Sequence, residues 1–154
     1  MSDTYLPPDE RSTGRALRLL AAADHAALGT LAGGDPLVTR VECLWLAGRG
    51  LGLLLSDLAD HARALEADAR ASVLVGSVTS GPPMAAARLT LTGEAWPIDK
   101  RAERDTWLAA HPRAAVYFDF ADFRMRLLAP ASALLNAGFG RAYRLGPADL
   151  GCGT

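Results

Sequence analysis

Apolar residues recur along the chain in two rhythms, and the first of these predicts a helix near the start. One face at helical spacing is formed by Ala16, Leu19, Leu20 and Ala23. Ser12, just before this face, is a residue type that caps helix N-termini. We therefore expect a helix over about residues 12–24, preceded by a flexible lead-in of residues 1–11.

From Ala26 onward the apolar stretches are short and are separated by turn sequences. Gly33-Gly34-Asp35-Pro36 forms one interruption, and Gly48-Arg49-Gly50 forms the next. Clusters of glycine, aspartate and proline between apolar runs are typical of tight turns between strands. The pattern predicts antiparallel hairpins whose strands cover about residues 28–31, 37–46 and 51–55.

The second half of the chain continues with short elements. Ser56 and Asp57 are candidate caps for a short helix that ends near Ala67, in which Asp60 and Arg63 can pair on the solvent side. The further expected elements are strands at 72–78 and 89–96, a helix that begins at Asp99 and stops before Pro112, and closing strands at about 123–135 and 139–145.

This order of elements predicts a mainly β fold with short helices. A parallel βαβ sheet needs a helix between nearly every pair of strands, and the chain has no room for them. Strands joined mostly by hairpins favour an antiparallel barrel with helices at its ends.

Composition narrows the class of protein. The 154 residues are 50% hydrophobic and 21% charged, which fits one folded domain and not a disordered chain. The formal charge of -1 gives no global field that favours nucleic acid or an acidic membrane surface. The apolar runs are too short to span a bilayer. Cys43 and Cys152 form neither a disulfide framework nor a zinc site, so we expect a cytoplasmic protein with free thiols.

The sequence contains no recognisable catalytic motif. The three histidines have no spacing that places two on one helical face, so we expect no metal site. His25 and His111 are expected at the C-terminal ends of helices, where a structural role is sufficient. The sequence contains no Gly-x-Ser-x-Gly elbow, P-loop or paired catalytic carboxylates, and Gly138-Phe139-Gly140 lacks the rest of a dinucleotide fingerprint. No catalytic residue is therefore assigned.

One group of polar residues is compatible with phosphate binding. Ser56, His61 and Arg63 flank the start of the short helix, and Arg88 begins a strand that can lie beside it. A helix N-terminus, hydroxyl groups and cationic side chains are the groups that bind phosphate. The same residues also fit a solvated helix face and an arginine at a strand edge, so the chemistry alone leaves both interpretations open.

An ordered series of short motifs runs from about residue 14 to 145. It consists of Gly29-Thr30-Leu31, Pro36 after the glycine turn, SDLADH at 56–61, ASVLV at 71–75, ARLTLTG at 87–93, His111-Pro112, Asp122-Phe123 and GFGRA at 138–142. In this order the motifs resemble the FMN-binding split-barrel proteins of the pyridoxamine 5'-phosphate oxidase-like superfamily. Within that superfamily the chain is most similar to the haem-utilisation type.

The resemblance implies a six-stranded antiparallel split barrel with Greek-key topology over residues 12–146, followed by a tail at 147–154. It also implies a homodimer with two FMN sites at its interface. The family positions that hold the FMN phosphate fall on Thr39, Ser56, His61, Arg63 and Arg88. Main-chain groups of Arg40, Val41 and Glu42 are the candidates for contacts with the flavin ring.

Departures from the family pattern weaken the FMN assignment. Thr39 replaces a common serine, and Ala62 and Ala64 replace hydrogen-bonding residues, each lost bond to a dianion costing about 1.5 to 3 kcal/mol. The chain also lacks the C-terminal Trp and Arg pattern with which true pyridoxamine phosphate oxidases bind substrate, so that activity is not expected.

Three functions follow as alternatives. The first is an FMN-dependent oxidoreductase acting with a small-molecule electron donor or acceptor. The second is a protein that binds haem or another tetrapyrrole in the same dimer cleft. The third is a dimeric binding module without a cofactor, which Ala62 and Ala64 favour.

Overall fold

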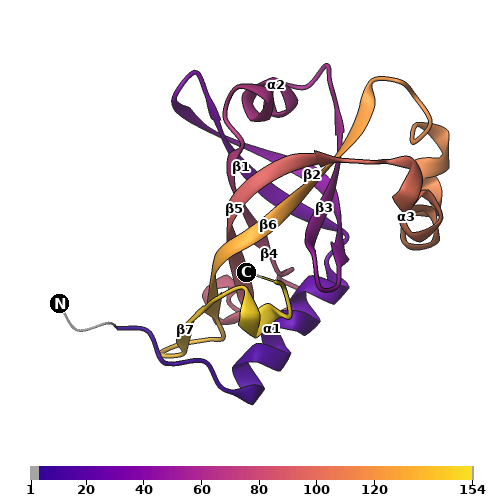
Figure 1. Cartoon of the computed structure of the whole chain (residues 1–154). Coiled ribbons are helices and arrows are strands. Elements are labelled where there is room, and N and C mark those ends of the chain that lie inside the picture. The colour runs from indigo at the N-terminus through magenta and orange to yellow at the C-terminus, as the bar shows by residue number, and fades with distance from the viewer. Residues whose placement is uncertain (1–3, 154) are drawn as a thin grey trace.

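Short apolar runs joined by tight turns assemble into one antiparallel sheet in the computed structural model, which describes residues 4–153 (Figure 1). Its strands are β1 (His25–Ala32), β2 (Asp35–Leu46), β3 (Gly50–Ser56), β4 (Arg70–Val75), β5 (Arg88–Ile98), β6 (Phe123–Asn136) and β7 (Ala142–Leu145). Their order is β3-β2-β1-β4-β5-β6-β7, and β3 also pairs with β6. Strands β1 to β6 therefore close into a barrel that β7 extends. The predicted mainly β, six-stranded antiparallel barrel is confirmed.

The first four strands have a Greek-key connection. β1, β2 and β3 follow one another through hairpins, and β4 returns to pair with β1, which gives the order β4-β1-β2-β3. Between β1 and β2, Gly33 and Gly34 have φ values of 61° and 89°. Two positive φ values are what a two-residue type I′ turn requires, so glycine here specifies the predicted hairpin.

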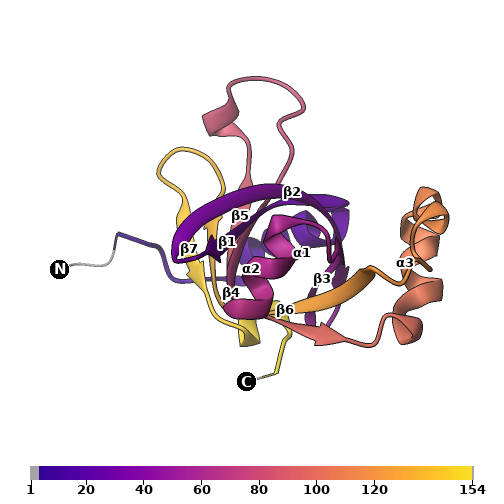
Figure 2. The same ribbon diagram turned by 90° about the horizontal axis from the view of Figure 1, so that it is seen from above.

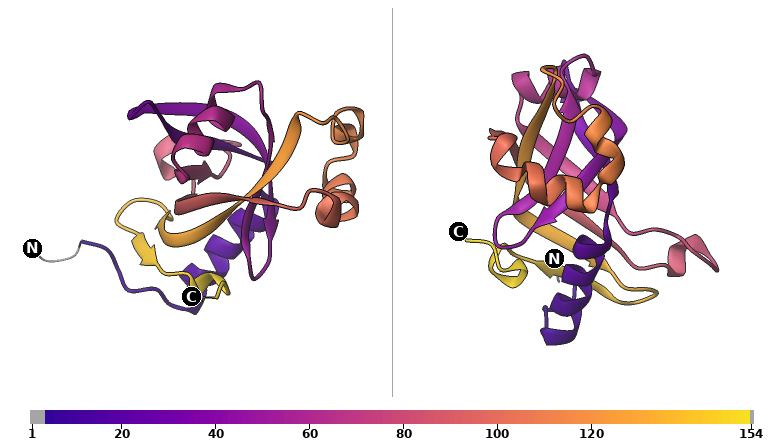
Figure 3. Two further views of the ribbon diagram at one scale, coloured as in Figure 1. Left: turned by 45° about the horizontal axis from the view of Figure 1, so that its top comes forward. Right: turned by 90° about the vertical axis from the view of Figure 1, so that its right-hand side faces the viewer.

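Helices cover both ends of the barrel (Figures 1 and 2). Helix α1 (Glu10–Ala22) lies at one end and α2 (Asp60–Ala67) at the other, and Leu20 of α1 and Leu65 of α2 are buried in the barrel core. Helix α3 (Arg104–Ala110) lies outside the barrel, beside its wall (Figure 3). The 3-10 helices are η1 (Pro83–Ala85), η2 (Arg101–Glu103), η3 (Pro112–Val116) and η4 (Ala148–Leu150).

The start and end of α1 differ from the prediction. Asp9 caps the helix: Ser12 N donates to Asp9 Oδ1 at 2.7 Å, and Asp9 N donates to Ser12 Oγ at 2.9 Å. Ser12 is thus the third helical residue of a reciprocal capping box and not the cap itself. The helix ends at Ala22, and Ala23 already has extended backbone. The expectation that His25 lies at a helix C-terminus is therefore wrong, because His25 begins β1.

The expected caps of α2 are also wrong. The N-cap is Ala59, which makes no side-chain cap hydrogen bond. Ser56 Oγ instead accepts from Leu58 N at 3.2 Å in the turn before the helix. The Asp57 carboxylate pairs with Arg124 at 2.9 Å, so it too is unavailable to the helix.

Three strand boundaries differ from the prediction by three residues, and the first is the start of β1 at His25 instead of residue 28. β4 stops at Val75 instead of continuing to residue 78, because Gly76 has a φ of 117° and its backbone passes close to Ala87 O, where a Cβ would lie at 2.6 Å. β7 begins at Ala142 and not at Phe139, because residues 137–141 form the turn before it.

Both ends of the described chain pack on the barrel. Leu6 N donates to Ala142 O at 2.8 Å, and Leu6 forms a parallel bridge with Tyr143. Leu150 and Cys152 are buried in the barrel core. The described parts of the predicted lead-in and tail therefore contact the domain, whereas residues 1–3 and 154 lie outside the described residues.

A second apolar cluster lies outside the barrel, under α3 and η3. Trp107 and Phe118 are almost completely buried there against Leu54 and Met125 of the barrel wall. Leu53 and Leu55 face the inner core, so alternation along β3 turns Leu54 outward. This outer cluster holds α3 and η3 against β2 and β3.

The close contact between β5 and β6 gives a stability prediction. Gly93 lies at a register shift, and a Cβ there would be 2.1 Å from Ala129 O. We expect Gly93→Ala to lower the free energy of unfolding by at least about 1 to 3 kcal/mol, as overpacking does. Gly14→Ala is the control, because a Cβ there meets only the end of the Arg18 side chain and alanine favours the helix by about 0.5 to 1 kcal/mol. Urea unfolding of both variants measures this, and equal stability of wild type and Gly93→Ala would contradict the close approach.

Candidate functional site

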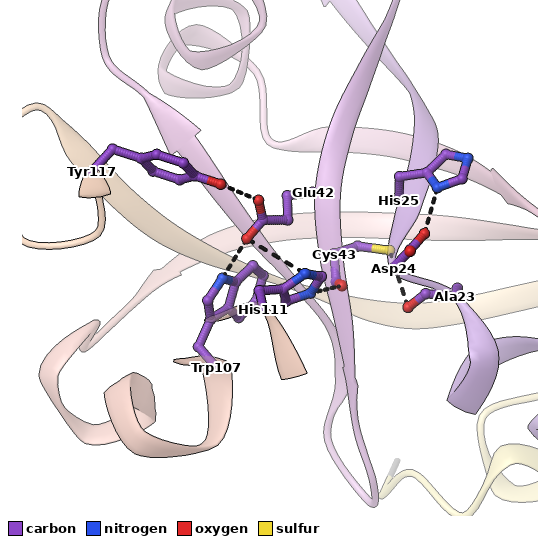
Figure 4. Close-up of polar contacts among 8 residues, drawn as sticks. All are labelled: Ala23, Asp24, His25, Glu42, Cys43, Trp107, His111 and Tyr117. Atoms are coloured by element: carbon purple, nitrogen blue, oxygen red, sulfur yellow. Dashed lines mark hydrogen bonds and ion pairs between the residues drawn. The ribbon is translucent and has the colours of Figure 1, made fainter. Parts of the chain in front are cut away.

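Glu42 on β2 is the centre of a cluster of polar side chains (Figure 4). Trp107 Nε1 donates to Glu42 Oε1 at 2.7 Å, and the Tyr117 hydroxyl donates to Oε2. His111 Nδ1 lies 3.7 Å from Oε1. The Glu42 side chain is only 24% exposed, so these groups take the place of much of the water that would solvate its charge.

His111 links the same segment to β2 through the main chain. It is the C-cap residue of α3, as the sequence predicted, and its backbone N donates to Trp107 O at 2.7 Å. Its Nε2 lies 2.8 Å from Cys43 O. A carbonyl oxygen only accepts, so Nε2 carries a proton and donates it. His111 therefore holds a fixed orientation between α3 and the barrel wall.

Two potential nucleophiles near this cluster are kept neutral. Burial and the hydrogen bond to Glu42 raise the pKa of Tyr117 from 10.0 to about 12. Burial raises the pKa of the Cys43 thiol from 9.0 to about 12. At neutral pH Tyr117 therefore acts as a hydrogen-bond donor, and Cys43 is an unreactive residue of the core.

Asp24 and His25 form a hydrogen-bonded pair at the start of β1. His25 Nδ1 lies 2.5 Å from Asp24 Oδ1, and the two side chains are 53% and 75% exposed. The hydrogen bond from His25 lowers the pKa of Asp24, so its carboxylate is ionised at neutral pH and can only accept. Nδ1 therefore carries a proton and donates it, whereas Nε2 makes no hydrogen bond to any residue in 4–153.

A second polar group lies between α2 and the ends of β2 and β3. His61 Nδ1 is 2.9 Å from Thr39 Oγ1. Ser56 Oγ donates to Asp122 Oδ2 at 3.0 Å and accepts from Leu58 N. Burial lowers the pKa of His61, so the ring is neutral at neutral pH. The hydroxyls and the imidazole are thus already engaged with one another and with neighbouring groups.

Three cavities along β2 share Arg40 in their walls. The largest, of about 600 Å³, is lined by residues that include Asp24, His25, Arg40, Glu42, His111, Arg113 and Tyr117. A second, of about 470 Å³, shares Asp24, His25 and Arg40 with the first and has apolar walls that include Leu19, Val38 and Leu74. A third, of about 250 Å³, contacts Ser56 and His61 and shares Arg40, Val41, Glu42 and Tyr117 with the largest.

The predicted residue Arg63 does not line these cavities, and neither do Ala62 and Ala64, the two α2 positions that depart from the family pattern. Arg63 Nη1 pairs with Asp60 Oδ1 at 3.4 Å, as predicted, and Nη2 donates to Leu58 O. Ala64 is 5% exposed and Ala62 packs against the core. Arg63 thus lies on the solvent side of α2, whereas Ala62 and Ala64 pack towards the core.

Arg88 lies apart from the start of α2 in the single chain. Its Nη1 donates to Met84 O and Ala86 O, both at 3.1 Å. The next residue, Leu89, pairs with Val75 at the end of β4 that is farther from α2. The Arg88 side chain thus binds main-chain carbonyl groups of the loop that carries η1. This loop projects from the barrel (Figure 2).

The structure thus brings together most of the predicted site residues and adds others. Those around the shared cavities are Thr39, Arg40, Val41, Glu42, Ser56 and His61, whereas Arg63 and Arg88 lie elsewhere. Asp24, Trp107 and Tyr117 were not predicted, and His25 and His111 were given structural roles only. In the sequence, only the adjacency of Asp24 and His25 could have indicated these additional site residues. Glu42 offered none, because its partners lie 65 to 75 residues away in sequence.

No protein-family model and no curated protein matches the sequence, but solved structures do. One solved structure is 42% identical, covers 94% of this chain and 98% of its own, and has a TM-score of 0.89. A haem-binding protein from Mycobacterium smegmatis is 29% identical, with 95% of this chain and 61% of that chain covered and a TM-score of 0.85. This chain therefore spans about three fifths of that protein's length.

A third structure identifies the fold. It is a Clostridium acetobutylicum protein related to general stress protein 26, of the pyridoxinephosphate oxidase family, at 13% identity and a TM-score of 0.72, covering 93% of this chain and 99% of that chain. The closed barrel with helices at its ends therefore has the same fold as this pyridoxinephosphate oxidase family protein.

Two further findings concern metal binding and membrane spanning. Within residues 4–153, no group of three or more His, Cys, Asp or Glu side chains is placed to hold a metal ion. No helix of that part of the chain is long and apolar enough to cross a membrane.

The Glu42 cluster predicts a dependence of stability on alkaline pH. The pKa of Tyr117 is raised in the folded state, so its contribution to stability is complete below pH 10 and is lost as pH rises towards 12. We expect Tyr117→Phe to lower the free energy of unfolding by about 1.5 to 3 kcal/mol at neutral pH and to reduce its decline above pH 10.

Trp107→Phe is the matched control, because it also removes one donor to Glu42 but leaves the phenol in place. Denaturant unfolding from neutral to alkaline pH, followed together with tyrosinate absorbance, measures both effects. An identical alkaline decline in Tyr117→Phe and wild type would contradict the assignment.

Proposed function

We propose that this chain binds haem, or a closely similar tetrapyrrole, in the two larger cavities along β1 and β2. The observation that carries the proposal is the composition of these cavities. They share an imidazole, His25, and a cation, Arg40, and the smaller one has apolar walls. A tetrapyrrole presents a large apolar face, a metal and two carboxylates, which matches these three kinds of group.

The side chains that line these two cavities fit haem better than they fit a flavin phosphate. Arg40 is exposed, and its side chain makes no hydrogen bond or ion pair with any residue in 4–153, so its guanidinium is free to meet a propionate. The similarity to a haem-binding protein at 29% identity supports the same choice. When bound, haem supplies one-electron and oxygen chemistry, and the protein supplies orientation and an axial ligand.

Binding of FMN is the second candidate, and the observation that favours it is the polar group at the third cavity. Ser56 and His61 line this cavity, and Thr39, a third position that the family resemblance assigns to the phosphate, contacts His61. A single chain does not complete the predicted phosphate site, because Arg63 and Arg88 lie away from this cavity. A flavin would therefore need a second copy of the chain to supply cations. It would make the protein an oxidoreductase with a small-molecule electron donor or acceptor.

A homodimer is the third part of the proposal. Val38 on β2 and Leu74 on β4 are 70% and 44% exposed, and between them β1 presents only Ala27 and Gly29. The cavity of about 470 Å³ includes both residues in its walls, and a further cavity of about 330 Å³ beside this face includes Val38. Exposed apolar faces of this kind are commonly covered by a second copy, which would here also enclose the ligand.

Parallel titrations of the purified protein with hemin, protoporphyrin IX and FMN test the ligand. We expect hemin to bind with a sharpened Soret band at one per chain, protoporphyrin IX to bind in competition with it, and FMN to bind weakly or not at all. Arg40→Gln should weaken hemin binding about tenfold through loss of a charge-assisted hydrogen bond. Arg104→Gln, an arginine outside the three cavities, is the control.

Strong FMN binding without hemin binding would contradict the proposal and favour the flavoprotein. Binding of none of the three compounds would favour a module without a cofactor. Equal hemin affinity of Arg40→Gln and Arg104→Gln would remove Arg40 from the site.

Light scattering at micromolar concentration tests the dimer. We expect a mass of twice 16.2 kDa for wild type and a monomer for Val38→Asp combined with Leu74→Asp, because two charges would then be buried at the interface. Trp96→Asp is the matched control, since Trp96 is 57% exposed on β5 where that strand pairs with β6, on the side of the barrel away from β1. A monomeric wild type, or dimers of all three proteins, would show that this face is not the interface.

A further inference from the structure

We infer that His25 Nε2 is the axial iron ligand of the bound haem and that Asp24 is the positioning residue that orients it. This inference rests on the proposed haem-binding function and adds the residue that would bind the metal. His25 lies where the two larger cavities meet, so its ring can approach a ligand that occupies both.

The geometry of the Asp24 and His25 pair is that of a metal-binding histidine. Metal-ligating histidines almost always donate their other ring N–H to a carboxylate, a carbonyl or water, which fixes the tautomer and raises the basicity of the ligand. His25 Nδ1 makes this contact with Asp24 Oδ1 at 2.5 Å. Nε2 makes no hydrogen bond to any residue in 4–153 and has the lone pair that iron requires.

The other two histidines are less suitable. His111 has both ring nitrogens occupied, Nε2 by Cys43 O at 2.8 Å and Nδ1 next to Glu42 at 3.7 Å. His61 has one free nitrogen, but its partner is the neutral hydroxyl of Thr39. Its cavity of about 250 Å³ is also the smallest of the three. His25 is thus the histidine with a carboxylate partner, a free nitrogen and room for a macrocycle.

Arg40 extends the same argument to the edge of the ligand. β1 and β2 pair so that Ala27 lies opposite Arg40 and His25 opposite Glu42. Arg40 and His25 are therefore diagonal neighbours on adjacent strands. Arg40 would thus be the cation available to the carboxylates of a haem held by His25.

The test compares three proteins with two porphyrins. Wild type, His25→Ala and His61→Ala are each titrated with hemin and with iron-free protoporphyrin IX, and the ferrous haem complexes are examined by resonance Raman spectroscopy. We expect His25→Ala to lose the iron–histidine stretching band and to bind hemin at least about tenfold more weakly, as loss of a metal contact does. Its affinity for protoporphyrin IX should be unchanged, because that ligand has no iron. Added imidazole should restore the band.

His61→Ala is the matched control and should behave as wild type in every measurement. Loss of the band in His61→Ala but not in His25→Ala would overturn the inference, as would a band present in all three proteins. In either case the proposed function would stand, because hemin would still bind. Failure of wild type to bind both porphyrins would overturn the proposed function and this inference together.

The variant Asp24→Asn tests whether Asp24 acts on the His25 ligand without itself binding iron. The asparagine side chain can still accept from Nδ1 but has no charge, so it should make the imidazole a poorer electron donor. We expect the iron–histidine band to persist at lower frequency and the midpoint potential to become more positive. Unchanged band and potential would show that Asp24 does not act on the ligand.

Discussion

The register of β1 against β2 is the constraint on which the candidate site depends. It places His25 directly opposite Glu42, and Arg40 on the same face of β2 two residues away. Val41 and Cys43, the residues that alternate with them, are buried in the barrel core. Because side chains alternate along a strand, a shift by one residue would bury the charged side chains and expose the apolar ones. Burial of the core residues therefore fixes the position of the polar ones.

The outer apolar cluster supplies the second fixed component. Trp107 is fully buried there, and its indole N–H reaches Glu42, so the packing that holds α3 also orients the carboxylate. His111 follows at the end of the same helix and binds the main chain of β2. The largest cavity thus has one wall from the barrel and one from α3 and η3, and neither wall can move without breaking both a hydrogen bond and an apolar contact.

The fold could be predicted because its determinants are local. The two-residue glycine turn at Gly33-Gly34, the short apolar runs and the hairpin connections each specify a neighbouring segment, and together they indicated the barrel and its helices. The order of the family motifs added the topology. Element boundaries were less accurate where a single backbone conformation decides them, as at Gly76 and Ala23.

The site could be predicted only in part, because some of its contacts are not local. The contact of Thr39 with His61 was anticipated by the family positions. The partners of Glu42 come from a segment that only the outer cluster brings near. His25 was placed at a helix end because nothing in the sequence marks Ala22 as the last helical residue. Arg88 was misplaced relative to α2 because its position depends on the pairing of β5 with the far end of β4.

The central claim is that a tetrapyrrole binds on the wall formed by β1 and β2. A crystal structure of the hemin complex, with anomalous data collected at the iron edge, tests it most directly. The account predicts one iron peak per chain next to His25 Nε2, with density for the macrocycle between that residue and Arg40. A peak beside His61, or one outside the cavities along β2, would contradict it.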